Sequence, residues 1–67
     1  MASFLNVAEG LQIFEKYRPG KQLAGAEHDV ILSIDMPMED LSADDLRRLD
    51  DMGWFLSGEF ACWAIFV

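Results

Sequence analysis

Residues 41–67 constrain the fold more than any other stretch, because they carry the signals of three consecutive elements. Ser42 is a strong N-cap candidate, and Asp45 takes the third helical position, where a glutamate usually completes a capping box. Leu46 begins the apolar face of the helix. Gly53 supplies the left-handed residue with which helices commonly end. The sequence therefore predicts a short acidic helix with both ends defined.

Strand-forming residues follow this helix in two segments, 54–56 and 61–67. Ser57 and Gly58 between them suit the tight turn of a β-hairpin. The second segment is almost continuously apolar, which is typical of a strand that is buried on both faces. We therefore expect the last strand to lie in the centre of the sheet, antiparallel to both neighbours.

The N-terminal half predicts a helix and one strand. Apolar residues at positions 4, 7, 8, 11 and 14 form one helical stripe, and Pro19-Gly20 ends the helix. Gly10 weakens its interior, which suggests that another element packs close to it. In a strand over residues 28–34, Val30, Leu32 and Ile34 would face the core together.

The expected fold class is α+β, with one domain over residues 1–67 and the chain order α-β-α-β-β. The three strands would form a mainly antiparallel sheet, and both helices would pack on one face of it. The other face of the sheet would show some of Ile31, Trp54 or Phe55, and Trp63 or Phe66.

The formal charge of −7 is concentrated in the middle of the chain, where residues 27–51 carry nine acidic side chains against Arg47 and Arg48. Such a field repels phosphate backbones, so direct nucleic-acid binding is not expected. It attracts a basic protein surface. Solubility of an apolar small domain is the simpler role of the same charge.

No export signal is predicted, because the N-terminal residues have neither a basic flank nor a long apolar run. The longest apolar run, residues 60–67, is far shorter than the ~20 residues of a membrane-spanning helix. With one cysteine and no export signal, we expect a cytoplasmic protein without membrane contact.

Glu27, His28 and Asp29 have the side-chain types of a metal or catalytic site. Neighbours in an extended strand point to opposite sides, however, and no second histidine completes a zinc site. We therefore assign no catalytic, cofactor-binding or metal-binding residue and expect no enzymatic activity. A metal-binding protein or enzyme centred on this cluster is the alternative.

A small domain with 52% hydrophobic residues cannot cover all of its apolar surface, so we expect an exposed patch and a partner for it. Core packing and the anchoring of a protein interface are the two roles expected of the tryptophans. Loop methionines suit an adaptable contact, although core packing of the methionines is equally consistent with the pattern. The candidate interaction surface comprises Trp54, Trp63, Phe66, Met36, Met38, Asp44, Asp50 and Asp51.

Two stretches carry a resemblance: Ala26-Glu27-His28-Asp29, and Leu46-x-x-Leu49-x-x-Met52-Gly53-Trp54 followed by Trp63-x-x-Phe66-Val67. Over about residues 6–67, the chain resembles small acidic proteins of unknown function from bacteria and their phages. In those proteins the pattern is Ala-Glu-His-Asp, Leu-x-x-Leu-Gly-Trp and a tryptophan strand. The resemblance implies no established activity or cofactor, and it favours an accessory role of the kind that phages and mobile elements encode.

The leading functional hypothesis is an acidic protein-interaction module. Its specific version is an inhibitor that docks on a basic, nucleic-acid-binding surface of a host protein. A structural subunit of a homo-oligomeric assembly, with the homodimer as its simplest form, is a further alternative.

Overall fold

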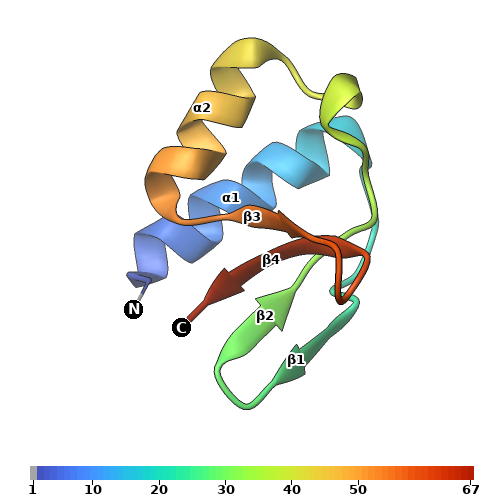
Figure 1. Ribbon diagram of the computed structural model, residues 1–67. Coiled ribbons are helices and arrows are strands. Elements are labelled where there is room, and N and C mark those ends of the chain that lie inside the picture. Colours follow the sequence, from blue (N-terminus) through green and yellow to red (C-terminus); the bar gives the residue numbers. More distant parts are fainter. Residues whose placement is uncertain (1) are drawn as a thin grey trace.

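The computed structural model describes residues 2–67 as an α+β fold with two helices and a four-stranded antiparallel sheet (Figure 1). A short 3-10 helix, η1, precedes the second α-helix. The elements are α1 (Phe4–Tyr17), β1 (Gly25–Glu27), β2 (Val30–Leu32), η1 (Met38–Asp40), α2 (Ala43–Met52), β3 (Phe55–Ser57) and β4 (Cys62–Phe66).

Strand β4 lies inside the sheet, whose order is β1-β2-β4-β3 and whose neighbours all run antiparallel. The predicted place of the last strand is thus confirmed. The predicted number of three strands is wrong, because residues 28–34 do not form one strand. His28 and Asp29 instead form the two-residue turn of a hairpin in which Glu27 pairs with Val30. The Gly-Ala-Glu sequence of β1 has no apolar alternation to indicate a strand.

A β-bulge follows β2 and changes which side chains face the core. The N–H of Ser33 donates to the carbonyl of Trp63 at 2.8 Å, and the N–H of Trp63 donates to the carbonyl of Ile34 at 2.9 Å. Two residues of one strand therefore lie opposite a single residue of the next. As a result, Ile31 before the bulge and Ile34 after it both pack against the core.

Val30 and Leu32 pair with Phe66 and Ala64 on the opposite face of the sheet. The expectation that Val30, Leu32 and Ile34 share one face is therefore wrong. Val30 is nonetheless buried. Leu32 and Ile34 lie on different faces because the bulge shifts the alternation of side chains by one residue between them.

Aromatic side chains form the middle of the core. The ring of Phe14 on α1 meets the indole of Trp54 edge-to-face at 5.2 Å and lies 5.8 Å from the indole of Trp63. Side chains from both α-helices, from β4 and from the connecting segments complete one cluster: Ile13, Phe14, Met36, Leu41, Leu49, Trp54, Trp63 and Ile65.

Helix α2 ends as its sequence predicts. The side chain of Ser42 accepts a hydrogen bond from the N–H of Asp45 at 3.1 Å. At the other end, Gly53 has φ of 98°, and the N–H of Trp54 bonds to the carbonyl of Leu49 at 2.9 Å. This bond satisfies a terminal carbonyl and turns the chain directly into β3.

Gly10 lies where α1 approaches the indole of Trp54. A Cβ atom at Gly10 would overlap atoms of that ring, so only glycine allows this approach. The expectation that another element packs close to Gly10 is confirmed.

We predict that Gly10→Ala destabilises the protein, although alanine normally improves a helix interior by about 1 kcal/mol. The overlap with Trp54 should outweigh this gain, with an overpacking cost of about 1–3 kcal/mol. Urea denaturation measures the effect. Gly58→Ala is the control, since nothing lies within 4 Å of the added Cβ, and it should change stability little. A Gly10→Ala protein as stable as the parent would contradict the close contact.

Candidate functional site

Three of the eight residues predicted for the interaction surface lie in the core, which corrects that prediction. Trp54 and Trp63 are 2% exposed and Met36 is fully buried. Both indole N–H groups donate to backbone carbonyls, Trp54 to Asn6 at 3.1 Å and Trp63 to Met36 at 2.8 Å. Their polar atoms are thus satisfied inside the molecule, so neither ring can serve as an exposed anchor.

The other five predicted residues are exposed. Phe66 stacks on Phe55 at 5.3 Å and faces away from the side chains of Trp63 and Ile65, because side chains alternate along β4. Phe55 pairs with Ala64, which lies on the same face of β4 as Phe66. Phe55 and Phe66 are therefore the aromatic residues on the sheet face opposite Trp63 and Ile65. Met38 and the aspartates of α2 are exposed as well.

A groove beside β3 brings together four of the predicted residues. Met38 of η1 and Asp50 of α2 line it, as do parts of Trp54 and Trp63. The groove has a volume of about 370 Å³ and is mainly apolar. Since both tryptophans are almost fully buried, they form its floor, while half-exposed Met38 forms its margin.

Three further residues line this α2–β3 groove and were not in the predicted surface: Leu46, Phe55 and Leu56. Leu46 was predicted to face the core. In the structure it is half-buried, because it covers the margin of the core next to β3. The signal that could have found the groove is the position of β3 at the edge of the sheet, which leaves one side of this strand without a neighbour.

Most of the basic side chains form ion pairs within the molecule. Among residues 2–67, Lys16 and Arg48 lie 2.7 and 3.8 Å from carboxylate oxygens of Asp45, and Arg18 lies 2.7 Å from Asp40. Three of the five basic side chains therefore serve two of the twelve acidic ones. Ten acidic side chains are left outside these pairs.

Asp44 with Arg48 and Arg47 with Asp51 are opposite charges at i,i+4 spacing on α2, a spacing that favours ion pairs. Neither pair is among the ion pairs of the described residues. Arg48 approaches Asp45 instead. Asp44, Asp50 and Asp51 are thus exposed on α2 without an ion-pair partner in residues 2–67. Asp50 places one of these charges directly at the groove.

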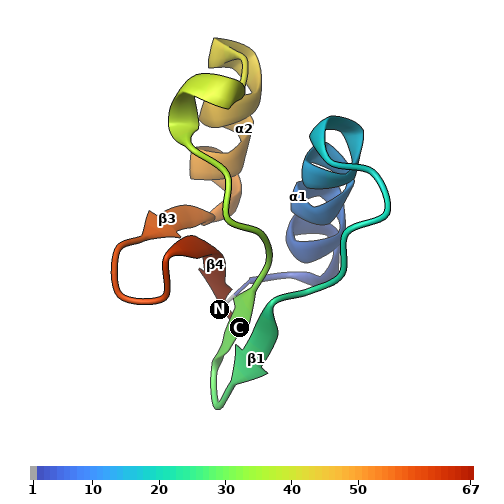
Figure 2. The ribbon, with the colours of Figure 1, turned by 90° about the vertical axis from the view of Figure 1, so that its right-hand side faces the viewer.

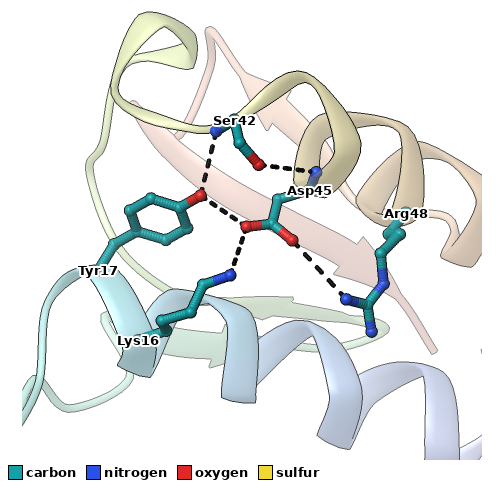
Figure 3. A network of polar contacts seen from close by, with 5 residues as sticks. All are labelled: Lys16, Tyr17, Ser42, Asp45 and Arg48. Atoms are coloured by element: carbon teal, nitrogen blue, oxygen red, sulfur yellow. Dashed lines mark hydrogen bonds and ion pairs between the residues drawn. The ribbon is translucent and has the colours of Figure 1, made fainter.

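Asp45 is the centre of a polar network that joins the end of α1 to the start of α2 (Figure 3). Its carboxylate accepts hydrogen bonds from the Lys16 ammonium at 2.7 Å and from the Tyr17 hydroxyl at 2.6 Å. The Tyr17 hydroxyl also accepts a hydrogen bond from the N–H of Ser42 at 3.1 Å.

Tyr17 thereby extends the predicted capping box. In the usual box, a glutamate carboxylate reaches back to the N–H of the N-cap residue. Aspartate is one methylene shorter, and the hydroxyl of Tyr17 stands between Asp45 and the N–H of Ser42 (Figure 3). The network positions α2, which forms one wall of the groove.

These hydrogen bonds also set the ionisation of the pair. The Lys16 ammonium and then the Tyr17 hydroxyl lower the pKa of Asp45 below its ordinary value of 3.8, although burial acts in the opposite direction. The bond to Asp45 raises the pKa of Lys16 above its ordinary 10.5. Both groups are therefore charged at neutral pH.

Glu27, His28 and Asp29 lie at the tip of the β1–β2 hairpin, and all three are exposed. Among residues 2–67, no group of three or more His, Cys, Asp or Glu side chains could hold a metal ion. The metal-binding alternative thus gains no support from geometry. Burial raises the pKa of the Cys62 thiol, which disfavours the reactive thiolate form.

Neither helix of the described chain is long and apolar enough to cross a membrane. Comparisons with protein-family models, curated proteins and solved structures find no match. The groove and the charge around it are therefore the features of the molecule that bear on its function.

We predict that Asp45→Asn lowers the free energy of unfolding at pH 7 by about 1–3 kcal/mol, because Lys16 and Tyr17 lose a charged acceptor. A carboxylate with a lowered pKa stabilises the fold above its unfolded pKa and stops doing so as pH falls. The deficit relative to the parent should therefore be constant from pH 5 to 7 and shrink below pH 3.8.

Urea denaturation across this pH range measures the difference. Asp44→Asn is the matched control: it makes the same charge change one position earlier, on an exposed side chain. It should cost only about 0.5 kcal/mol through the helix dipole. Equal losses for the two variants would mean that the network does not hold α2.

Proposed function

We propose that this chain is a small, non-catalytic protein-interaction module whose α2–β3 groove binds a basic segment of another protein. The observation that carries the proposal is Asp50: a carboxylate without an ion-pair partner in residues 2–67, lying at a mainly apolar groove. An apolar surface with an anionic margin fits a partner segment that combines apolar and basic side chains.

The charge of the whole chain supports the same partner chemistry. With ten acidic side chains outside the internal ion pairs, a basic surface is attracted from a distance as well as on contact. The specific version that we propose is an inhibitor, of the accessory kind encoded by phages and mobile elements, that covers a basic nucleic-acid-binding surface of a host protein.

The proposal includes an arrangement of layers in which both helices pack on one face of the sheet. Trp63 and Ile65 point to one side of β4 and share a core with Phe14 of α1 and Leu49 of α2, which supports this arrangement. The opposite side carries the stacked Phe55 and Phe66, together with Val30 and Leu32, which pair with Phe66 and Ala64 of β4. The groove opens at the margin of these layers, beside β3.

We predict that a basic heptapeptide binds the groove. The probe reads threonine, lysine, threonine, valine, threonine, lysine, threonine, with both ends blocked, and its binding is followed by NMR titration of labelled protein. Asp50→Asn should weaken binding about two- to fivefold, the effect of one exposed charge pair. High salt should also weaken binding of the peptide to the parent protein, because it screens the attraction between opposite charges.

Glu27→Gln is the matched control, because it removes one negative charge at the opposite edge of the sheet, on β1. It should leave the affinity almost unchanged. An equal effect of both variants would show that the total charge attracts the peptide without a site. Affinity that is indifferent to salt would rule out the electrostatic partner altogether.

A structural subunit of a homo-oligomer is the second candidate, and one observation favours it. Phe4 is 98% exposed and Phe66 is 57% exposed, and the N- and C-terminal ends lie next to each other in two perpendicular views (Figures 1 and 2). Apolar side chains of this size near both ends suit burial against a second copy.

Salt distinguishes the two candidates in a sedimentation equilibrium experiment. Copies that each carry a charge of −7 repel one another, so salt should strengthen self-association. A complex with a basic partner should weaken under the same change. A protein that stays monomeric at high salt would remove the oligomer candidate.

A further inference from the structure

Strand β3 leaves part of its backbone without a partner in the sheet. It pairs only with β4, since it is the last strand in the order β1-β2-β4-β3. In an antiparallel pair, successive residues direct their N–H and C=O groups alternately toward the partner strand and away from it. The hydrogen bonds of β4 show which residue of β3 directs its backbone N–H and C=O groups away from the sheet.

The hydrogen bonds of Trp63 identify this residue as Leu56. Both backbone groups of Trp63 bond across the bulge to Ser33 and Ile34 and are therefore directed away from β3. Leu56 is the register partner of Trp63 on β3. Its N–H and C=O are consequently directed to the open edge of the sheet, beside the groove that its side chain lines.

We propose that the bound segment is extended and adds to β3 as a new antiparallel strand, hydrogen-bonded to the N–H and C=O of Leu56. This inference rests on the proposed function and specifies how the partner binds. Directly paired residues point to the same face of a sheet. The segment residue opposite Leu56 therefore directs its side chain into the groove, over Trp63.

The groove determines the chemistry of the segment. The side chain opposite Leu56 meets Met38 and Leu46 and is apolar. Residues two positions before and after it point to the same face, where Asp50 is available to a lysine or arginine. The expected residue pattern of the segment is basic, any, apolar, any, basic. The occupant of the groove is therefore a segment of another protein that carries this pattern.

A second copy of this chain does not match that pattern at its own β3. The strand reads Phe-Leu-Ser, and no basic residue lies between Arg48 and the C-terminus. Pairing two β3 edges would also bring two Asp50 carboxylates toward one groove region, in molecules that each carry a charge of −7. Charge complementarity therefore favours a basic partner.

The test uses the same heptapeptide with a single N-methyl group in one of two places. Methylation of the central valine nitrogen removes the donor that would bond to the carbonyl of Leu56. Methylation of the following threonine nitrogen removes a donor that points away from β3. The two peptides have the same charge, composition and added methyl group, so they differ only in the edge that is blocked.

We expect the valine-methylated peptide to lose binding at least tenfold and the threonine-methylated peptide to retain it within about threefold. Amide hydrogen exchange gives a second readout. At a peptide concentration ten times Kd, exchange of the Leu56 amide should slow about tenfold. The amide of Ala26, on the opposite edge strand β1, is the control and should not change.

The outcomes separate the two proposals. Both methylated peptides could bind with equal affinity while Asp50→Asn still weakens their binding. Strand addition would then be wrong, and the groove would remain a site for basic segments. If no peptide binds, the proposed function itself fails. Protection of Leu56 that rises with protein concentration in the absence of peptide would overturn the proposal in favour of pairing with a second copy.

Discussion

The packing of Phe14 between two tryptophans is the constraint on which the rest of this structure depends. A chain of 67 residues with one cysteine has no internal disulfide to hold it together, so its core must be efficient. Trp54 and Trp63 provide large apolar rings, and each ties its N–H group to a backbone carbonyl in another segment. The bond of Trp54 ties α1 to the residue before β3, and the bond of Trp63 ties the segment before η1 to β4.

The same two rings explain why the candidate site is a groove. Because Trp54 and Trp63 are held from behind by Phe14 and by their hydrogen bonds, their remaining edges form a rigid floor. Helix α2 forms the wall above this floor, and its position depends on the Asp45 network with Lys16 and Tyr17. A site built on fixed elements needs little ordering when a partner binds, which reduces the entropic cost of association.

Local signals allowed much of the fold to be predicted. Ser42 and Gly53 define α2 because caps act within a few residues, and the apolar run of β4 indicates its central place. The rest depends on contacts between distant residues. Tyr17 reaches Asp45 across 28 positions, and the bulge at Ser33 pairs with Trp63, 30 positions away. No pattern within one segment reveals either feature. The sequence therefore does not predict the shift in β2, and it leaves core packing and interface anchoring of the tryptophans as alternatives.

The acidic charge also answers a problem that the open edge creates. An unpaired strand edge next to apolar side chains is a template for pairing with another copy of the same chain. β3 is only three residues long, and Asp50 lies in the groove beside it. Each copy carries this carboxylate and a net charge of −7, so the charge that we propose attracts a basic segment to Leu56 also makes two identical edges repel each other. One set of aspartates can therefore make the edge selective for a partner of opposite charge while keeping it open.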